Sequence, residues 1–218
     1  SSCPNLKLLQ LTSSRECIIP FTEKWKNGLL SNYEYLMYCN LIGGRSFNDL
    51  SQYPVFPWVL SNYSSENLDL NDKNNYRDLS KPIGALNPKR LSNLIENYEL
   101  CTDSPEKCLY RLHYSNAFYV VHYLARLEPY TTLHIKMQDK KFDKPNRMFW
   151  NIERSYNAVT SQSNDFRELI PEFFTLPDFL VNENHFDLGF HKELNVKIDD
   201  VVLPPWAHNP DEFINIHR

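Results

Sequence analysis

The sequence predicts a mainly α-helical protein in which many short to medium helices pack around a core of extended, irregular segments, with few or no regular strands. Two patterns indicate this fold class. Several stretches carry helix-capping residues followed by apolar residues at helical spacing. By contrast, the most hydrophobic stretch, residues 53–60, contains Pro54 and Pro57, which exclude a helix interior and a central strand. Residues 201–206 contain two adjacent prolines and are also predicted to be extended.

Length and composition suit one cytoplasmic domain. The 218 residues, of which 42% are hydrophobic, are enough for a sizeable core. The formal net charge of -4 argues against direct binding to nucleic acid. The five cysteines include no CxxC pair, which indicates neither a disulfide framework nor a zinc site and favours a reducing compartment. No apolar run reaches the length of a transmembrane segment, and no signal peptide is recognisable.

The first half is predicted to contain a leader, one capped helix and the buried extended segment. Residues 1–24 are interpreted as the leader or linker. Ser31 and Glu34 form the capping-box pattern of the helix, and Gly43 ends it. Residues 61–75 are rich in Ser, Asn and Asp, so they are predicted to lie on the surface.

The second half is predicted to be helical from its caps and its periodicity. The expected helices span residues 87–98, 115 or 116–127, 131 or 132–139, and 145–160. Asp143 is the predicted cap of the last of these, and Asp165 with Glu168 forms another capping-box pattern. Residues 173–180 are predicted to form short turns buried by aromatic side chains. Asn209, followed by a proline, begins a final helix.

Polar residues near the extended segment are interpreted as a structural core network that supplies hydrogen bonds to its backbone. The network consists of Arg45, Asn48, Asp49, Arg77, Asp78 and Lys81. In this interpretation Arg45 pairs with Asp49 or Asp78, and Arg77 pairs with the other. The functional alternative is a phosphoinositide-binding site, because two arginines and a lysine suit anion recognition.

No catalytic, cofactor-binding or metal site is predicted. His113 and Ser115 are close in sequence, but the chain has no nucleophile elbow. The intervals between His208, Asp211 and His217 do not match a helical metal motif. The enzyme alternative is a phosphoester or lipid hydrolase that would use Arg45, Asp49, Asp78 and His113.

Several strings resemble the BEACH domain family, which is named for beige and Chediak-Higashi protein. The closest match is GRSFNDLSQYPVFPWVL followed by YRDLSKPIGA. Further matches are SNYEYLMYCNLIGGR, LHYSNAFYVVHYLARLEPY, ELIPEFFTLPDFLVNENHFDLG and VVLPPWAHNPDEFINIHR. Together they cover nearly all of the chain from Trp25 onward.

The resemblance implies that residues 25–218 form a BEACH domain lacking its C-terminal portion. It implies a non-enzymatic interaction module in a large cytoplasmic scaffold, active in vesicle and membrane traffic, lysosome-related organelles or autophagy, and peripheral on intracellular membranes. Implied partners are an upstream pleckstrin-homology-like domain, to which residues 1–24 would connect, downstream β-propeller repeats, and other trafficking proteins.

Three residues are candidates for a partner-binding groove: Trp25, Asn32 and Tyr33. Aromatic side chains beside polar groups are typical of interface centres. The family resemblance implies that this groove lies against the upstream domain.

Overall fold

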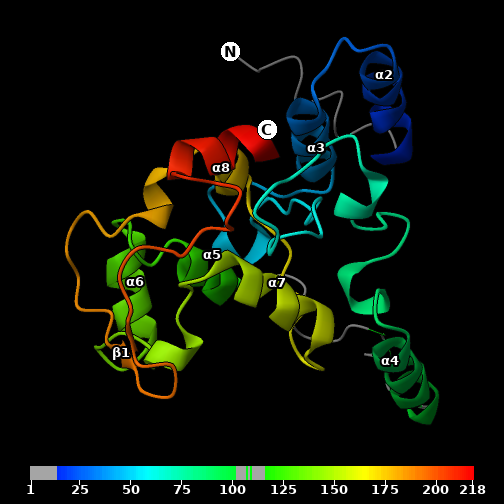
Figure 1. Cartoon of the computed structure of the whole chain (residues 1–218). Helices are drawn as coiled ribbons and strands as arrows, with labels where there is room; N and C mark the ends of the chain where they lie inside the picture. The colour runs from blue at the N-terminus through cyan, green and yellow to red at the C-terminus, as the bar shows by residue number, and fades with distance from the viewer. Residues whose placement is uncertain (1–13, 102–106, 108, 110–115) are drawn as a thin grey trace, which may run out of the picture.

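The structure, a computed structural model, describes residues 14–101, 107, 109 and 116–218 (Figure 1). Its α-helices are α2 (Ser14–Lys26), α3 (Asn32–Ile42), α4 (Pro88–Leu100), α5 (Ala117–Tyr123), α6 (Tyr130–Met137), α7 (Ile152–Ser161) and α8 (Pro210–His217). The short 3-10 helices are η1 (Leu50–Gln52), η2 (Lys73–Asn75), η3 (Ile83–Ala85), η4 (Pro145–Arg147), η5 (Pro171–Phe174) and η6 (Asp178–Leu180). Strands β1 (Phe190–His191) and β2 (Val196–Lys197) pair antiparallel, with Phe190 opposite Lys197. The predicted fold class, mainly α with few regular strands, is confirmed.

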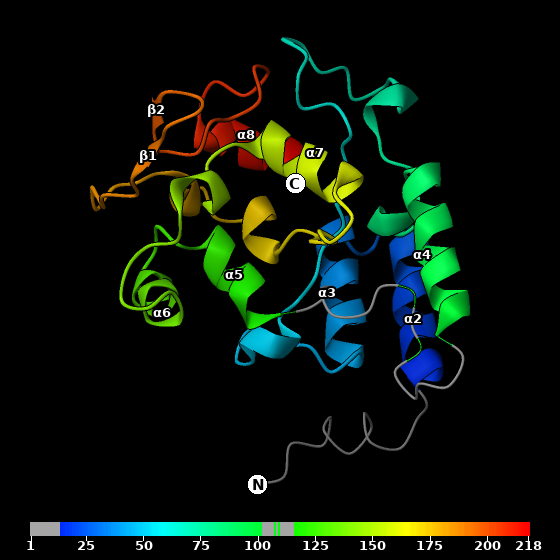
Figure 2. The same ribbon diagram turned by 90° about the horizontal axis from the view of Figure 1, so that it is seen from below.

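The extended segment 53–60 runs through the core, as predicted. Figure 2 shows this part of the chain passing between α3 and α5. Phe56 and Trp58 are fully buried, and the Trp58 ring meets the Tyr63 ring edge to face at 5.4 Å. In place of a sheet ladder, the segment makes isolated bridges, such as that between Phe56 and Leu169. The prolines exclude a helix here, while the hydrophobic side chains keep the segment inside.

The predicted helix starts are confirmed where the cap is local in sequence. Ser31 accepts a hydrogen bond from the Glu34 backbone, and the Glu34 carboxylate accepts one from the Ser31 backbone. Asn87, Asn116 and Asn209 each cap the helix that follows with the side-chain oxygen. The predicted short turns are present as η5 and η6.

Helix α2 was not predicted. It begins at Ser14, inside the predicted leader, and contains Pro20. It packs against α3, and the hydroxyls of Thr22 and Tyr35 lie 3.0 Å apart between the two helices. The division into leader and domain at residue 24 stays a prediction.

The predicted helix over residues 145–160 is wrong in its first half. Asp143 does not cap it; the helix begins at Ile152, and Asn151 is its cap. Trp150 is extended because its carbonyl accepts from the Val202 N–H at 2.8 Å, while the Ile152 N–H donates to the Val202 carbonyl at 3.1 Å. Pairing with a distant strand-like segment thus overrides the local helical pattern.

Two other predicted elements also differ from the structure. Helix α5 ends at Tyr123, four residues before the predicted end at Leu127. The Asp165–Glu168 pattern does not form a capping box, because Asp165 binds Arg167 and Glu168 is used in the core.

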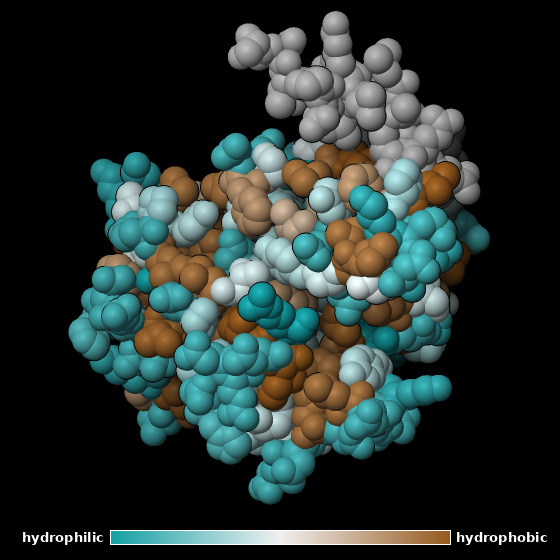
Figure 3. All heavy atoms as spheres, turned by 90° about the horizontal axis from the view of Figure 1, so that it is seen from above, coloured by the Kyte–Doolittle hydropathy of each residue, from teal (hydrophilic) through white to brown (hydrophobic). Residues whose placement is uncertain are grey.

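None of the helices in the described ranges has both the length and the apolar character that crossing a membrane requires. On the face seen in Figure 3, apolar side chains form small patches separated by hydrophilic ones.

Candidate functional site

The predicted groove residues Trp25 and Asn32 lie together at the turn between α2 and α3. Gly28 has a φ of +70°, a left-handed conformation that favours glycine and allows the chain to reverse. Trp25 Nε1 donates to Asn32 Oδ1 at 2.8 Å, and the indole stacks on the Tyr35 ring at 4.6 Å. Trp25 is still 38% exposed. These three side chains form an ordered, accessible patch, here called the Trp25–Asn32 surface.

Tyr33, the third predicted groove residue, faces the core instead. Its ring centroid lies 5.2 Å from that of Phe56. Burial, and then the nearby Glu172 carboxylate, raise the pKa of the Tyr33 hydroxyl. Successive residues on a helix point about 100° apart, so Asn32 and Tyr33 diverge. A binding role for Trp25 and Asn32 remains a prediction.

The extended segment 53–60 obtains its first backbone partners from α3 and the turn after it. The Asn40 side chain donates to the Val55 carbonyl at 2.9 Å and accepts from the Val55 N–H at 2.8 Å. Arg45 donates to the Tyr53 carbonyl at 2.9 Å. The sequence analysis identified Arg45 and missed Asn40, whose amide replaces a neighbouring strand at this point.

The middle of the segment is held by a buried ion pair. Glu168 Oε2 accepts from the Trp58 N–H at 3.0 Å and from Arg77 Nη1 at 2.7 Å. Arg77 also donates to the Trp58 carbonyl at 3.3 Å, and its own N–H donates to the Val59 carbonyl at 2.9 Å. The side chains of Arg77 and Glu168 are each 4% exposed. Arg77 is therefore a core residue, as predicted, with a partner that was not predicted.

The other predicted network residues lie at the surface: Asn48, Asp49, Asp78 and Lys81. Asp49 caps η1, and Asp78 pairs with Lys81 at 3.1 Å. Hydrogen bonds from Ser80 and then Lys81 lower the pKa of Asp78 to about 2. Arg77 pairs with Glu168 and with neither of these aspartates, so the predicted pairing is wrong for Arg77. The reason is that exposed carboxylates keep their hydration, whereas a buried guanidinium requires a buried partner.

The structure describes three of the four residues of the hydrolase alternative. Arg45, Asp49 and Asp78 are each engaged as described above, and none of them lines the large pocket described below. His113 lies outside the described residues.

The two histidines considered for a metal site, His208 and His217, make different contacts. His208 pairs with Glu212 at 2.8 Å, whereas His217 lies against the Phe213 ring, and its burial lowers its pKa to about 4. Within the described ranges, no three His, Cys, Asp or Glu side chains are placed to hold a metal ion together.

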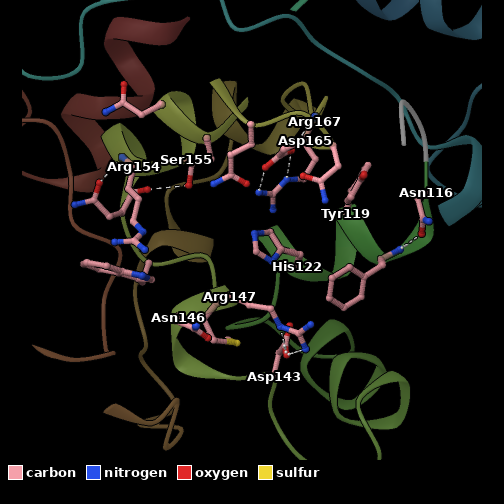
Figure 4. A pocket seen from close by; sticks show the side chains of 18 of the residues that line it. Asn116, Tyr119, His122, Asp143, Asn146, Arg147, Arg154, Ser155, Asp165 and Arg167 are labelled. Atoms are coloured by element: carbon pink, nitrogen blue, oxygen red, sulfur yellow. Dashed lines mark hydrogen bonds and ion pairs between the residues drawn. The ribbon is translucent and has the colours of Figure 1, made fainter. Parts of the chain in front are cut away.

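A large polar pocket, which the sequence analysis missed, lies between α5, α7 and residues 143–151 (Figure 4). Its volume is about 860 Å³, within the range of about 300–1,000 Å³ that is typical of ligand sites. Seven of its 20 lining residues are Asn or Gln. We call it the α5–α7 pocket.

Two ion pairs stand on opposite sides of this pocket, with His122 between them (Figure 4). Arg167 Nε donates to Asp165 Oδ1 at 2.8 Å, and Arg147 is paired with Asp143. His122 is 4% exposed, and its ring makes no hydrogen bond with the described residues. Burial, and then the positive charge of Arg167, lower the pKa of His122, so its imidazole is neutral. Each ion pair is short-range in sequence, but only the tertiary fold brings the two together.

Comparison with known protein families identifies the family of this chain. A family model described as the Beige/BEACH domain matches residues 23–218. The chain belongs to the BEACH domain family. A curated relative, the BEACH domain-containing protein lvsE of Dictyostelium discoideum, is 48% identical over 203 residues, which are 90% of this chain. The chain spans 9% of the length of that relative. The match to the BEACH domain includes Trp25, Asn32 and every residue of the α5–α7 pocket.

Proposed function

We propose that this BEACH domain is a non-enzymatic protein-interaction module of a larger cytoplasmic scaffold. The scaffold acts in vesicle and membrane traffic, in lysosome-related organelle biology or in autophagy, and associates peripherally with intracellular membranes. The observation that carries the proposal is the Trp25–Asn32 surface.

The geometry of this surface supports partner binding. Trp25 is held by the Asn32 hydrogen bond and by the Tyr35 ring while its remaining face is accessible. Tryptophan is among the residues that contribute most to interfaces. A side chain that is already ordered loses little conformational entropy on binding, so more of the contact energy remains as affinity.

The contacts of Arg45 and Arg77 support a non-enzymatic function. Arg45 and Arg77 donate to backbone carbonyls of the extended segment, and Arg77 is also paired with Glu168. These hydrogen bonds engage both guanidinium groups with the backbone of the extended segment. Because both guanidinium groups already bind backbone carbonyls, a phosphoinositide site formed by Arg45 and Arg77 is disfavoured.

The longer relative supports a scaffold built from several domains. Because the chain spans 9% of that protein, most of the relative consists of other segments. We propose as partners a pleckstrin-homology-like domain upstream in the same protein, β-propeller repeats downstream, and other trafficking proteins.

The test is a comparative pull-down with the full natural protein that contains this domain. Asn32→Lys places a charge on the Trp25–Asn32 surface and removes the acceptor of the Trp25 N–H. Asn215→Lys, at an exposed position on α8, is the matched control. Circular dichroism first confirms that the three proteins are equally folded. We then expect wild type and Asn215→Lys to recover the same partners, and Asn32→Lys to recover at least about tenfold less of one or more of them. Identical partner lists for all three proteins would refute the proposal.

Flotation with vesicles tests the lipid alternative. Binding to phosphatidylinositol phosphate vesicles but not to phosphatidylcholine vesicles, with Asn32→Lys unaffected, would favour a lipid-binding function over a protein-binding one.

A further inference from the structure

We propose that the α5–α7 pocket binds an extended peptide segment of a partner protein. An acidic side chain of this peptide forms an ion pair with Arg154. This inference extends the proposed function by giving the chemistry of one partner. It does not depend on the Trp25–Asn32 surface, which is formed by other helices.

The charge of the pocket points to a single carboxylate. Arg167 is neutralised by Asp165, and Arg147 by Asp143. Arg154 lines the same pocket from the first turn of α7 and forms no ion pair with the described residues. Its guanidinium lies 5.6 Å from the Trp150 ring, which helps to hold it in place. Among the described residues that line the pocket, one positive charge is therefore available, on the α7 side (Figure 4).

The lining of the pocket matches the backbone of a peptide. The side-chain amides of Asn157, Gln162 and Asn164 are exposed and make no hydrogen bond with the described residues. Each amide offers donors and an acceptor, which is the set that peptide N–H and C=O groups require. His122 adds a neutral imidazole at the centre, whose ring makes no hydrogen bond with the described residues and is free to donate or accept one. The described lining thus combines hydrogen-bond donors and acceptors with the unpaired guanidinium of Arg154.

A phosphate group suits the pocket less well. Phosphate sites commonly combine several unpaired cations, because the ligand carries close to two charges at neutral pH. Here two of the three arginines that line the pocket are already paired with Asp143 and Asp165, so one unpaired arginine among the described lining residues would face such a ligand. One unpaired Arg balances the single charge of an Asp or Glu side chain.

The experiment selects peptides from a random 12-residue display library on the immobilised chain of residues 1–218. Fluorescence anisotropy then measures selected peptides against four proteins: wild type, Arg154→Glu, Asn157→Ala and Asn32→Lys. Arg154 and Asn157 are exposed, so these variants should fold; circular dichroism checks it.

We expect the selected peptides to share an Asp or Glu and to bind Arg154→Glu at least about tenfold more weakly than wild type. Replacing the shared acidic residue by Lys should restore binding to Arg154→Glu and weaken it to wild type. Asn157→Ala should reduce affinity by a smaller factor, and Asn32→Lys should leave it unchanged. Loss of binding in Asn32→Lys alone would place the peptide on the other surface.

Three results would overturn the inference. The first is selected peptides whose affinity does not change in Arg154→Glu. The second is displacement of the peptide by millimolar inorganic phosphate or by inositol phosphates, since that would assign the pocket to phosphate. The third is peptide binding to residues 1–218 that is absent from the full natural protein, since another segment of that protein would then fill the pocket.

Discussion

Replacing Arg77 by Met should remove a large part of the stability of this domain. Arg77 and Glu168 are both 4% exposed and are joined at 2.7 Å. Removing one partner of a buried pair leaves the other charge uncompensated, which costs about 3–5 kcal/mol. A domain is typically stable by about 5–15 kcal/mol, so Arg77→Met alone should remove about a fifth or more of this stability. Urea denaturation followed by tryptophan fluorescence measures the loss.

The double variant Arg77→Met/Glu168→Gln separates the charge from the hydrogen bond. The introduced glutamine would keep an oxygen for the Trp58 N–H, which in the native protein donates to Glu168 Oε2 at 3.0 Å, but it carries no charge. We expect the double variant to be more stable than the sum of the two single variants predicts, by about 2 kcal/mol. Lys81→Met, at an exposed lysine, is the control and should leave the unfolding curve unchanged. Additive losses, or a loss in Arg77→Met no larger than in the control, would refute the role assigned to the buried pair.

Two further predictions concern other buried polar groups. Burial raises the pKa of Glu172, whose carboxylate accepts from the Tyr53 hydroxyl at 2.5 Å, so the folded state binds this proton more tightly and stability is lost as pH rises above about 4.5. Glu172→Gln should therefore gain stability relative to wild type between pH 4 and pH 8 in urea titrations, and a difference that stays constant with pH would contradict this. Arg126, fully buried, donates through two nitrogens to the Asp199 carbonyl and through a third to the Phe149 carbonyl. Arg126→Lys cannot reproduce this fork and should lose about 2–4 kcal/mol in the same assay, whereas Arg154→Lys at the exposed position should lose nothing measurable.

Features that depend on neighbouring residues were predictable from the sequence. The Ser31–Glu34 capping box and the Asn209 cap need only three or four residues, which fix the local backbone hydrogen bonds. The buried extended segment was also predictable, because its prolines and its hydrophobicity exclude other conformations.

Features that depend on distant residues were not predictable. Arg77 was placed correctly in the core, but its partner Glu168 is 91 residues away, and the pattern around Glu168 looks like a helix start. Trp150 was predicted to be helical because nothing in its own sequence reveals the pairing with Val202. The α5–α7 pocket was missed for the same reason. Each of its two ion pairs is local in sequence, but the two pairs come from different segments, which only the tertiary fold brings together.

The dependence of segment 53–60 on distant partners has a consequence for how the protein folds. Trp58 and Glu168 are separated by 110 residues, and Phe56 pairs with Leu169 across a similar interval. A ribosome must therefore synthesise most of the chain before this hydrophobic segment can be covered. Contacts at such long range slow folding, and the uncovered aromatic residues favour aggregation in the meantime. Nascent chains that end before Glu168 should consequently be clients of chaperones, whereas chains extended past Leu169 can bury the segment themselves.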